Sequence, residues 1–234
     1  PGIILYGSYG SAKTSFAEFL RGVIDPSSVP TMGMPSSHEE LIQQLDHHAI
    51  FCVDNNDKMS QPQSDSICRS VTGTGHTKRA LYTDDSDFTF QFKRTFIMNG
   101  INVAATSPDL LDRSILIELE RISEEERLLL SVLNREYVDG VSLILGGICA
   151  TVSQAMAIKN SSPIPKRLPR MADWYVWGRC MAEALGHDPD EFYRAYTENQ
   201  IQQNLEITSF EPVCQAVVLL VDQTVQRQWA GSPS

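Results

Sequence analysis

The sequence predicts an α/β fold in its first half, a three-layer αβα core with a parallel sheet, followed by an all-helical second half. Two observations lead to this prediction. Up to residue 120, short apolar runs alternate with stretches of helical periodicity, the pattern of a parallel sheet covered by helices. From residue 123 onward, the apolar residues repeat at helical spacing. We therefore expect a core over residues 1–122 and a helical region over residues 123–234.

Four apolar runs are expected to form the strands of the sheet. Strands buried on both faces read as continuous hydrophobic runs rather than alternating ones. The runs are GIILY at 2–6, AIFCVD at 49–54, TFIMNG at 95–100 and SILIELE at 114–120. The second run ends in Asp54, and the third ends in polar Asn99.

Helices are expected between these strands and throughout the second half. In the first half, periodic apolar spacing and capping boxes (Ser36 with Glu39, Ser37 with Glu40) predict helices at 13–24, from 36 to about 45, at 64–73 and at 107–113. In the second half the expected helices lie at 123–137, 141–158, 170–186, 190–203 and 211–229. Segments 78–85 and 88–94 alternate on either side of a DSD turn, which predicts a β-hairpin over about residues 78–94.

Composition limits the classes of protein that remain. The five cysteines are scattered without a C-x-x-C pair, which predicts buried, reduced thiols in a cytoplasmic protein rather than disulfides or a metal site. We see no leader segment and no apolar run approaching the ~20 residues of a membrane span, so no membrane association is expected. The net charge of −10 argues against an open basic nucleic-acid surface, although a basic strip inside a pore or groove remains compatible with it. Because the chain begins directly on a strand, we expect a fragment of a longer protein.

The stretch GSYGSAKT at 7–14 lies between the first strand and the first helix and differs by one residue from the phosphate-binding loop G-x-x-x-x-G-K-[ST]. In such loops, backbone N–H groups surround the phosphates, the lysine reaches the outer phosphates and the next hydroxyl holds Mg²⁺. Ala12 replaces the last glycine, which is tolerated if the φ angle of that residue is negative. The alternative is a chance glycine turn. The expected nucleotide-binding residues are Gly7, Ser8, Tyr9, Gly10, Ser11, Ala12, Lys13, Thr14 and Ser15.

Polar residues after the next two strands fit the same chemistry. Asp54 stands where P-loop enzymes keep the acid that orders Mg²⁺, so Thr14 and Asp54 are the candidate metal ligands. The residue after that acid is ordinarily a carboxylate that activates water, but here it is Asn55, which can orient water and cannot take its proton; Asp57 is a substitute. Asn99 can touch the γ-phosphate or the water. The plain alternatives are a helix cap for Asp54 and a turn for Asn99.

Two arginines complete the candidate set. Arg113 lies between the short helix and the last strand, where it either pairs with Asp109 or Asp112 or reaches the nucleotide of a neighbouring subunit. Arg170 begins a helix, where a basic residue opposes the helix dipole. It therefore either pairs with Asp173 or binds a ligand.

In this order, the loop, the acid, the asparagine, the two arginines and the helical region resemble the AAA+ ATPases. Within them the chain looks most like superfamily-III helicases and the primase-helicases of phages, poxviruses and integrated mobile elements. The likeness rests on TGTGHTKRALYTDDSDFTFQFKRTFIMNG, on DLLDRSILIEL, on PRMADWYVWG and on the GSAK of the loop. It spans roughly residues 2 to 200. The segment from residue 211 also looks like the opening of a winged-helix domain.

The resemblance implies a hexameric or otherwise ring-forming homo-oligomer that hydrolyses ATP with Mg²⁺. Lys13, Thr14 and Asp54 would hold Mg-ATP, Asn99 would be the first sensor, Arg113 a finger acting in trans and Arg170 the lid sensor. The hairpin would grip single-stranded DNA in the pore. Because the hairpin turn is acidic (DDSD), the DNA contacts would come from its base. The candidates there, which could equally form a solvated hairpin edge, are Lys78, Arg79, Lys93 and Arg94.

The function expected from these features is an ATP-driven DNA motor, a replicative helicase of a phage or mobile element, with a primase or another replication protein as an expected partner. Asn55 and the acidic turn favour a second hypothesis, in which the chain is an AAA+ switch. Such a switch binds ATP in order to assemble or to load other proteins, and it hydrolyses ATP slowly. A third reading is a non-catalytic interaction module with a relic loop. Ala12 favours it slightly, whereas the presence of Lys13, Thr14 and Asp54 opposes it.

Overall fold

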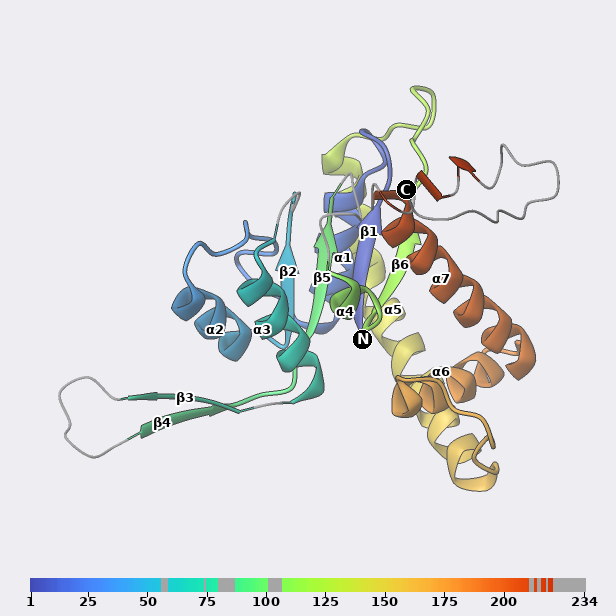
Figure 1. Ribbon diagram of the computed structural model, residues 1–234. Coiled ribbons are helices and arrows are strands. Elements are labelled where there is room, and N and C mark those ends of the chain that lie inside the picture. Colours follow the sequence, from blue (N-terminus) through green and yellow to red (C-terminus); the bar gives the residue numbers. More distant parts are fainter. Residues whose placement is uncertain are drawn as a thin grey trace.

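The core of the chain is a four-stranded parallel sheet, as the sequence predicts. A computed structural model describes residues 1–55, 59–73, 75–79, 87–100 and 107–210, together with 213, 216, 217, 219 and 220. The strands are β1 (Gly2–Tyr6), β2 (Ile50–Val53), β5 (Thr95–Asn99) and β6 (Ser114–Glu118), in the order β2-β5-β1-β6. Every neighbouring pair is parallel, so all four carboxyl ends lie at one edge (Figure 1).

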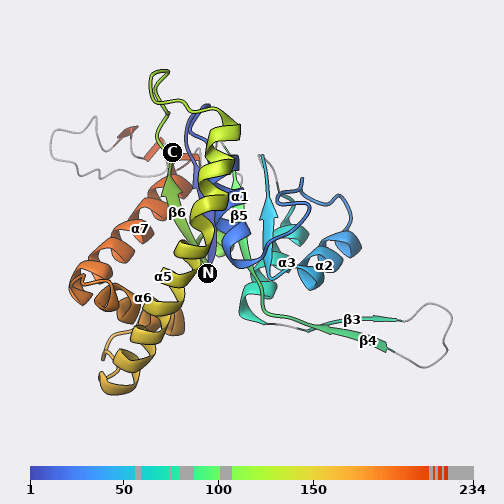
Figure 2. The same ribbon diagram turned by 180° about the vertical axis from the view of Figure 1, so that it is seen from behind.

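Helices cover both faces of this sheet and give the three layers expected from the sequence. On one face, α2 (His38–His47), α3 (Gln61–Thr72) and α4 (Pro108–Leu111) pack around Phe51 and Phe96, which are fully buried. On the other face, α1 (Lys13–Ile24) packs its Ala17 against Leu5 and Ile97. Figure 2 shows α1 and α5 (Leu130–Ser161) on this second face.

The predicted hairpin is present and projects away from the sheet. Its strands, β3 (Gly75–Arg79) and β4 (Asp87–Gln91), pair antiparallel, and β3 begins three residues before the predicted start at 78. Figures 1 and 2 both show this ribbon extending outward from the region between α3 and β5. Residues 84–86 of the acidic turn lie outside the described part of the chain, and so do the side chains of β3 and β4.

The second half is helical, but its first two predicted helices are wrong in their bounds. A single helix, α5, runs from Leu130 to Ser161 in place of helices at 123–137 and 141–158. Ser123 does not start this helix. Its hydroxyl donates to the carboxylate of Glu126 within an isolated turn, and the helix begins at residue 130. The Asp-Gly pair at 139–140 lies within α5 without ending it. The helices α6 (Ala172–Ala184) and α7 (Pro189–Phe210) follow.

The expectation that no segment has the length of a membrane span is also wrong. By length and composition α5 could cross a bilayer, with a mean hydropathy of 1.8 over its most apolar 18 residues, of which 6% are buried. It is the one such helix in the described part of the chain. Its exposed side chains include Leu143 and Ile144, which distinguishes it from an ordinary core helix. Length and composition alone do not place this helix in a bilayer.

Helix α7 returns to the sheet and covers the edge of β6. The side-chain oxygen of Asn199 accepts from the Leu116 N–H at 3.0 Å, and its amide donates to the Leu116 carbonyl at 2.7 Å. Buried Gln203 donates to the Ser114 carbonyl at 2.8 Å. These side chains satisfy the backbone groups that an edge strand otherwise leaves unpaired.

Replacing Asn199 with Ala is expected to lower the free energy of unfolding by about 2 kcal/mol, because the N–H and C=O of Leu116 then lose their partners. Urea unfolding monitored by circular dichroism measures this change. Asn204→Ala is the matched control, since Asn204 lies on the same helix and is exposed. Equal stability losses for the two variants would contradict the role of Asn199.

The described cysteines are free, and most of them are buried. Cys52, Cys68 and Cys180 are buried, whereas Cys149 is exposed on α5, unlike the burial expected for the group; Cys214 lies outside the described residues. Burial raises the pKa of the Cys52 and Cys68 thiols to about 11. Both are therefore protonated and unreactive at neutral pH.

Candidate phosphate-binding site

The loop at 7–12 lies at the carboxyl edge of the sheet, beside the polar residues predicted to act with it. Strand β5 lies between β1 and β2, so Asn99 comes between the loop and Asp54. Together they line a hollow of about 410 Å³, which also takes in Asn55 and Gly100. The structure thus brings residues 9–15 together with two strand ends that are distant in sequence.

The turn of the loop depends on its glycines. Gly7 has φ +139°, and a side chain there would place its Cβ 2.2 Å from the carbonyl oxygen of Leu119. Gly10 has φ +80°, and its carbonyl accepts from the N–H of Ile122 at 3.1 Å. Both conformations are ones that residues with a side chain rarely adopt. The segment after β6 therefore fixes the loop from the outside.

Ala12 does not have the negative φ that would make it an easy replacement for glycine. Its φ is +56° and its ψ +29°, in the left-handed region, directly before the first residue of α1. A left-handed alanine brings its Cβ close to the following carbonyl oxygen, at a cost of about 1–2 kcal/mol. The loop thus keeps the conformation that glycine normally provides and carries local strain at this position.

Ala12→Gly is accordingly expected to raise the free energy of unfolding by about 1 kcal/mol, because glycine adopts this conformation without strain. Thermal and urea unfolding measure the effect. Ala17→Gly serves as the control with the opposite expected sign, since Ala17 is a buried residue in the interior of α1. Destabilisation by both substitutions would argue against strain at Ala12.

Lys13 lies across the loop. Its ammonium donates to the carbonyl oxygens of Gly7 and Ser8, both at 2.8 Å, and to the hydroxyl of Ser11 at 3.2 Å. The Ser11 hydroxyl, in turn, donates to the Ser8 carbonyl at 2.9 Å. The positive charge is thereby held at the mouth of the loop, where an anion lying on the N-terminus of α1 would meet it.

Thr14 and Asp54, the candidate metal ligands, are in direct contact. The Thr14 hydroxyl donates to Asp54 Oδ1 at 2.9 Å, across a separation of 40 residues. Hydroxyl and carboxylate oxygens are ligands suited to Mg²⁺, which usually takes one or two protein carboxylates together with phosphate oxygens. The pair therefore fits a magnesium ion held between this edge of the sheet and a phosphate chain.

Asn99 lines this hollow and has one side-chain donor without a partner in the described part of the chain. The residue is 3% exposed, and its Oδ1 accepts from the backbone N–H of Asn55 at 2.7 Å. Its Nδ2 is buried and, within the described part of the chain, has no hydrogen-bond partner. Such a donor costs about 1–3 kcal/mol until it meets an acceptor. The Asn55 N–H thus orients the side chain of Asn99 and leaves its Nδ2 without an acceptor among the described residues.

Asn55 contributes its backbone to the site. Its φ of +53° is left-handed, a conformation that asparagine tolerates better than most residues, and it directs the N–H toward Asn99. A neutral amide at this position has no proton-accepting function at neutral pH. Asp57, the substitute suggested by the sequence, lies outside the described residues.

The two arginines lie together, but away from the loop. Arg113 directly precedes β6, at the amino edge of the sheet; its guanidinium donates to the Asp109 carbonyl at 2.8 Å and pairs with the Asp109 carboxylate. Arg170 pairs with Asp112 and, at 3.1 Å, with Asp109. The expected alternative partner of Arg170, Asp173, is not its partner. In the structure Arg170 therefore lies away from the loop of its own chain and does not contact it as a lid sensor of the same chain would.

The basic residues at the base of the hairpin fall into different environments. The guanidinium of Arg94 donates to the carbonyls of Leu45 and Asp46, both at 2.9 Å, at the end of α2. Because these hydrogen bonds hold the guanidinium of Arg94 at the end of α2, Arg94 is not well placed to bind DNA. Lys93 is exposed and faces the hollow at the amino edge. The side chains of Lys78 and Arg79 lie outside the described part.

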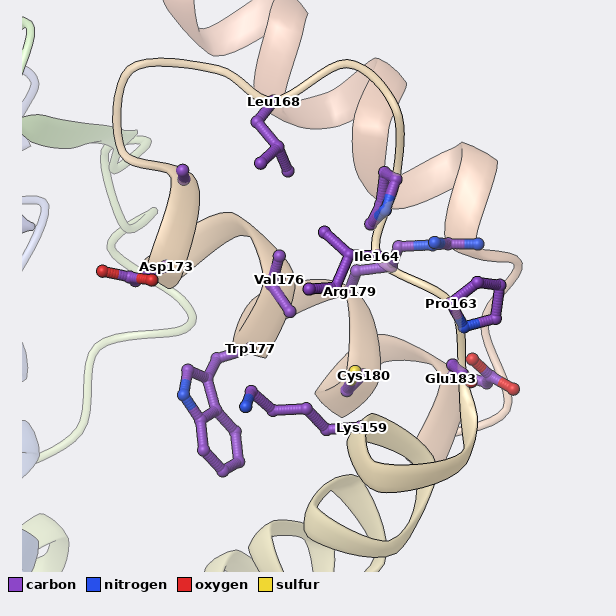
Figure 3. Close-up of a pocket in the computed structure, with 13 residues that line it drawn as sticks. Lys159, Pro163, Ile164, Leu168, Asp173, Val176, Trp177, Arg179, Cys180 and Glu183 are labelled. Carbon is purple, nitrogen blue, oxygen red and sulfur yellow. The ribbon is translucent and has the colours of Figure 1, made fainter.

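A second, smaller hollow of about 290 Å³ lies between the linker at 162–168 and α6 (Figure 3). Its walls are mainly carbon, from Ile164, Leu168 and Val176, and the Lys159 ammonium lies 5.1 Å from the ring centre of Trp177. Sequence reasoning missed this hollow because proline and aliphatic residues of a linker carry no motif. Its lining also includes the polar or ionisable side chains of Asp173, Arg179, Cys180 and Glu183.

Comparison with known proteins gives one informative match. No relative among curated proteins matches the chain at a significant level. A family model described as actinomycete integrative conjugative element replication protein matches residues 1–202. This range contains the loop, the four strands, the hairpin and both arginines. The match extends over most of the chain, which therefore belongs to this family of mobile-element replication proteins.

Proposed function

We propose that the chain is an AAA+ ATPase that binds Mg-ATP at the carboxyl edge of its sheet and drives DNA replication of a mobile element as a ring-forming motor. The observation that carries this proposal is the contact between Thr14 and Asp54 at 2.9 Å, next to the Lys13 loop and to Asn99, whose Nδ2 has no partner among the described residues. Lys13 and Asn99 are separated by 86 positions in the sequence, and together with Thr14 and Asp54 they offer the groups that suit a nucleoside triphosphate.

Each residue has a distinct task in this proposal. Loop N–H groups and the ammonium of Lys13 bind the phosphates, in place of the carbonyls that Lys13 now contacts. Thr14 and Asp54 hold Mg²⁺, which supplies charge neutralisation on the phosphates when bound. The Nδ2 of Asn99 donates to the γ-phosphate or orients the attacking water. Since phosphoryl transfer depends mainly on positioning and electrostatics, a strong protein base is not essential.

The hairpin supports the motor part of the proposal. A two-stranded ribbon of β3 and β4 that projects from the core can enter a central channel of a ring, as the resemblance implies, and contact single-stranded DNA there. With the Arg94 guanidinium bound to α2, the remaining basic candidates of the hairpin are Lys78, Arg79 and Lys93. A replication protein of this kind acts in the host cytoplasm, where the element's DNA resides, and a primase is a natural partner.

Asn55 favours a second candidate, a switch that binds ATP to assemble and hydrolyses it slowly. The amide replaces the carboxylate that would take the proton from water, and its backbone is committed to Asn99. In this case the same site controls assembly rather than movement.

Steady-state ATP turnover by the wild-type chain, with and without single-stranded DNA, tests the proposal. A motor gives turnover that DNA stimulates. Tight ATP binding with negligible turnover that DNA does not change supports the switch and contradicts the motor. Absence of both binding and turnover would reject the nucleotide site itself and leave an interaction module.

A further inference from the structure

We infer that Lys93, Arg113 and Arg170 form one anion-binding cluster at the amino edge of the sheet, which engages the triphosphate held by a second copy of the chain. The inference rests on the proposed function and goes beyond it by assigning Arg170 and Lys93 to the site of the neighbour. Arg170 then acts in trans, and Lys93 contacts a nucleotide rather than DNA.

The position of the cluster excludes contact with its own loop. Arg113 directly precedes Ser114, which pairs with Gly2 at the start of β1. The loop begins at Gly7, after the five residues of β1, and at ~3.3 Å per strand residue the two edges are roughly 16 Å apart. This separation exceeds the reach of an arginine side chain. A phosphate that contacts Arg113 must therefore belong to another molecule.

Arg170 is tied to the same edge by two carboxylates. Asp109 pairs with both arginines, and Asp112 pairs with Arg170 alone. The guanidinium of Arg113, and after it that of Arg170, holds the pKa of Asp109 below its ordinary value, so Asp109 stays ionised and keeps both cations in place. The side chain of Arg170 is 49% exposed and that of Arg113 18%, which leaves Arg170 the more accessible of the two.

Lys93 reaches the same place from the segment between β4 and β5. It lies two residues before Thr95, whose hydroxyl donates to the Pro1 carbonyl at 2.5 Å, at the start of the neighbouring strand. Lys93, Arg113 and Arg170 all line one hollow of about 570 Å³, with Trp174 and Trp177 on its wall. The carboxylate of Asp173 also lines this hollow.

The charges around the hollow explain why the cluster suits an anion delivered by a partner. Asp109 and Asp112 line a neighbouring hollow of about 530 Å³, which Arg170 also lines and which is distinct from the one beside the linker at 162–168. In the 570 Å³ hollow that Lys93, Arg113 and Arg170 line, Asp173 is the one acidic residue among the described lining residues. An anion with several charges, such as a triphosphate, can bind there while the aspartates keep the arginines oriented.

The two edges of the sheet are thus complementary in chemistry. The carboxyl edge holds the phosphate loop, and the amino edge holds basic groups that its own loop cannot use. Joining the amino edge of one copy to the carboxyl edge of the next is a head-to-tail contact, which produces a ring when the rotation closes. This geometry gives the nucleotide site residues from two copies.

Mixed assemblies of two inactive full-length variants test the inference. Arg170→Ala retains its loop, and Lys13→Ala retains its basic cluster, so a trans role predicts that mixing restores ATP turnover. With random assembly, about one quarter of the head-to-tail contacts are intact, which sets the expected recovery. Arg170→Ala alone should lose turnover ~10-fold or more while binding a fluorescent ATP analogue as the wild type does, and Lys93→Ala should show a smaller loss of the same kind.

Two controls separate the outcomes. Asp54→Ala mixed with Lys13→Ala should not recover, since both changes damage the same edge, and Arg167→Ala, an exposed arginine of the linker, should behave as wild type. Recovery with Arg113→Ala but none with Arg170→Ala would overturn the trans assignment of Arg170. Lys93→Ala with wild-type turnover would remove Lys93 from the cluster. If the wild-type chain has no turnover, the proposed hydrolysis itself fails, and that result is distinct from either of these.

Discussion

Lys13→Ala is expected to weaken ATP binding roughly 10- to 100-fold and to reduce ATP turnover to background. The ammonium is the charged donor at the mouth of the loop, and charge-assisted bonds to phosphate are worth about 1.5–3 kcal/mol. A difference of 1.4 kcal/mol corresponds to about tenfold in affinity. Titration with a fluorescent ATP analogue and a coupled turnover assay measure the two effects separately.

The variant must also be shown to fold. Lys13 bonds to Gly7 and Ser8, so its loss could loosen the loop, and circular dichroism and thermal unfolding will report this. Lys166→Ala provides a matched control, because Lys166 is an exposed lysine of the linker. Unchanged turnover in a folded Lys13→Ala protein would contradict the assignment of the loop.

Arg113→Ala is expected to lower ATP turnover by ~10³-fold or more and to leave ATP binding unchanged. An arginine that reaches the transferring phosphate stabilises charge in the transition state and contributes about 10³–10⁵ in rate. Binding should persist because Arg113 lies at the edge opposite the loop of its own chain. Single-turnover measurements and ATP titration distinguish these effects.

Arg113→Lys separates charge from geometry in the same position. Lysine keeps a positive charge near Asp109 but lacks the planar, forked set of donors, so it should recover little of the turnover. Loss of ATP binding in parallel with turnover would indicate that Arg113 has only a structural role, through its contacts with Asp109.

Much of the fold could be predicted from the sequence because its strands are strongly apolar. Two of them also end in polar residues, Asp54 and Asn99, which mark the carboxyl edge of the sheet. β2 is buried at every residue, which is what a continuous hydrophobic run predicts. The helix bounds were harder to predict. Ser123 begins a stretch that looks like a capped helix start, yet α5 begins at Leu130, and the Asp-Gly pair at 139–140 between its two expected parts does not end it. Local signals do not report where tertiary packing begins a helix.

The candidate site could be predicted where the ends of strands converge. The backbone conformation of single residues and the hydrogen-bond partners of the arginines could not be predicted. Thr14 and Asp54 meet as their positions after two strands suggest. The φ of Ala12 could not be read from its residue type, because alanine rarely adopts φ +56°. Nor did helical spacing in α1 reveal that Arg21 is fully buried, with its guanidinium donating to the carbonyls of Val29 and Pro30. Nor did the sequence show that Arg170 pairs with Asp109 and Asp112 rather than with Asp173.

Titration of the wild-type chain with ATP in the presence and absence of Mg²⁺ tests the central claim most directly. The account predicts saturable binding that weakens when Mg²⁺ is removed and weakens further in Asp54→Ala, since the Thr14–Asp54 pair is the proposed metal holder. ATP binding that is absent, or that is unaffected by both Mg²⁺ and Asp54→Ala, would contradict a magnesium–nucleotide site at this edge of the sheet.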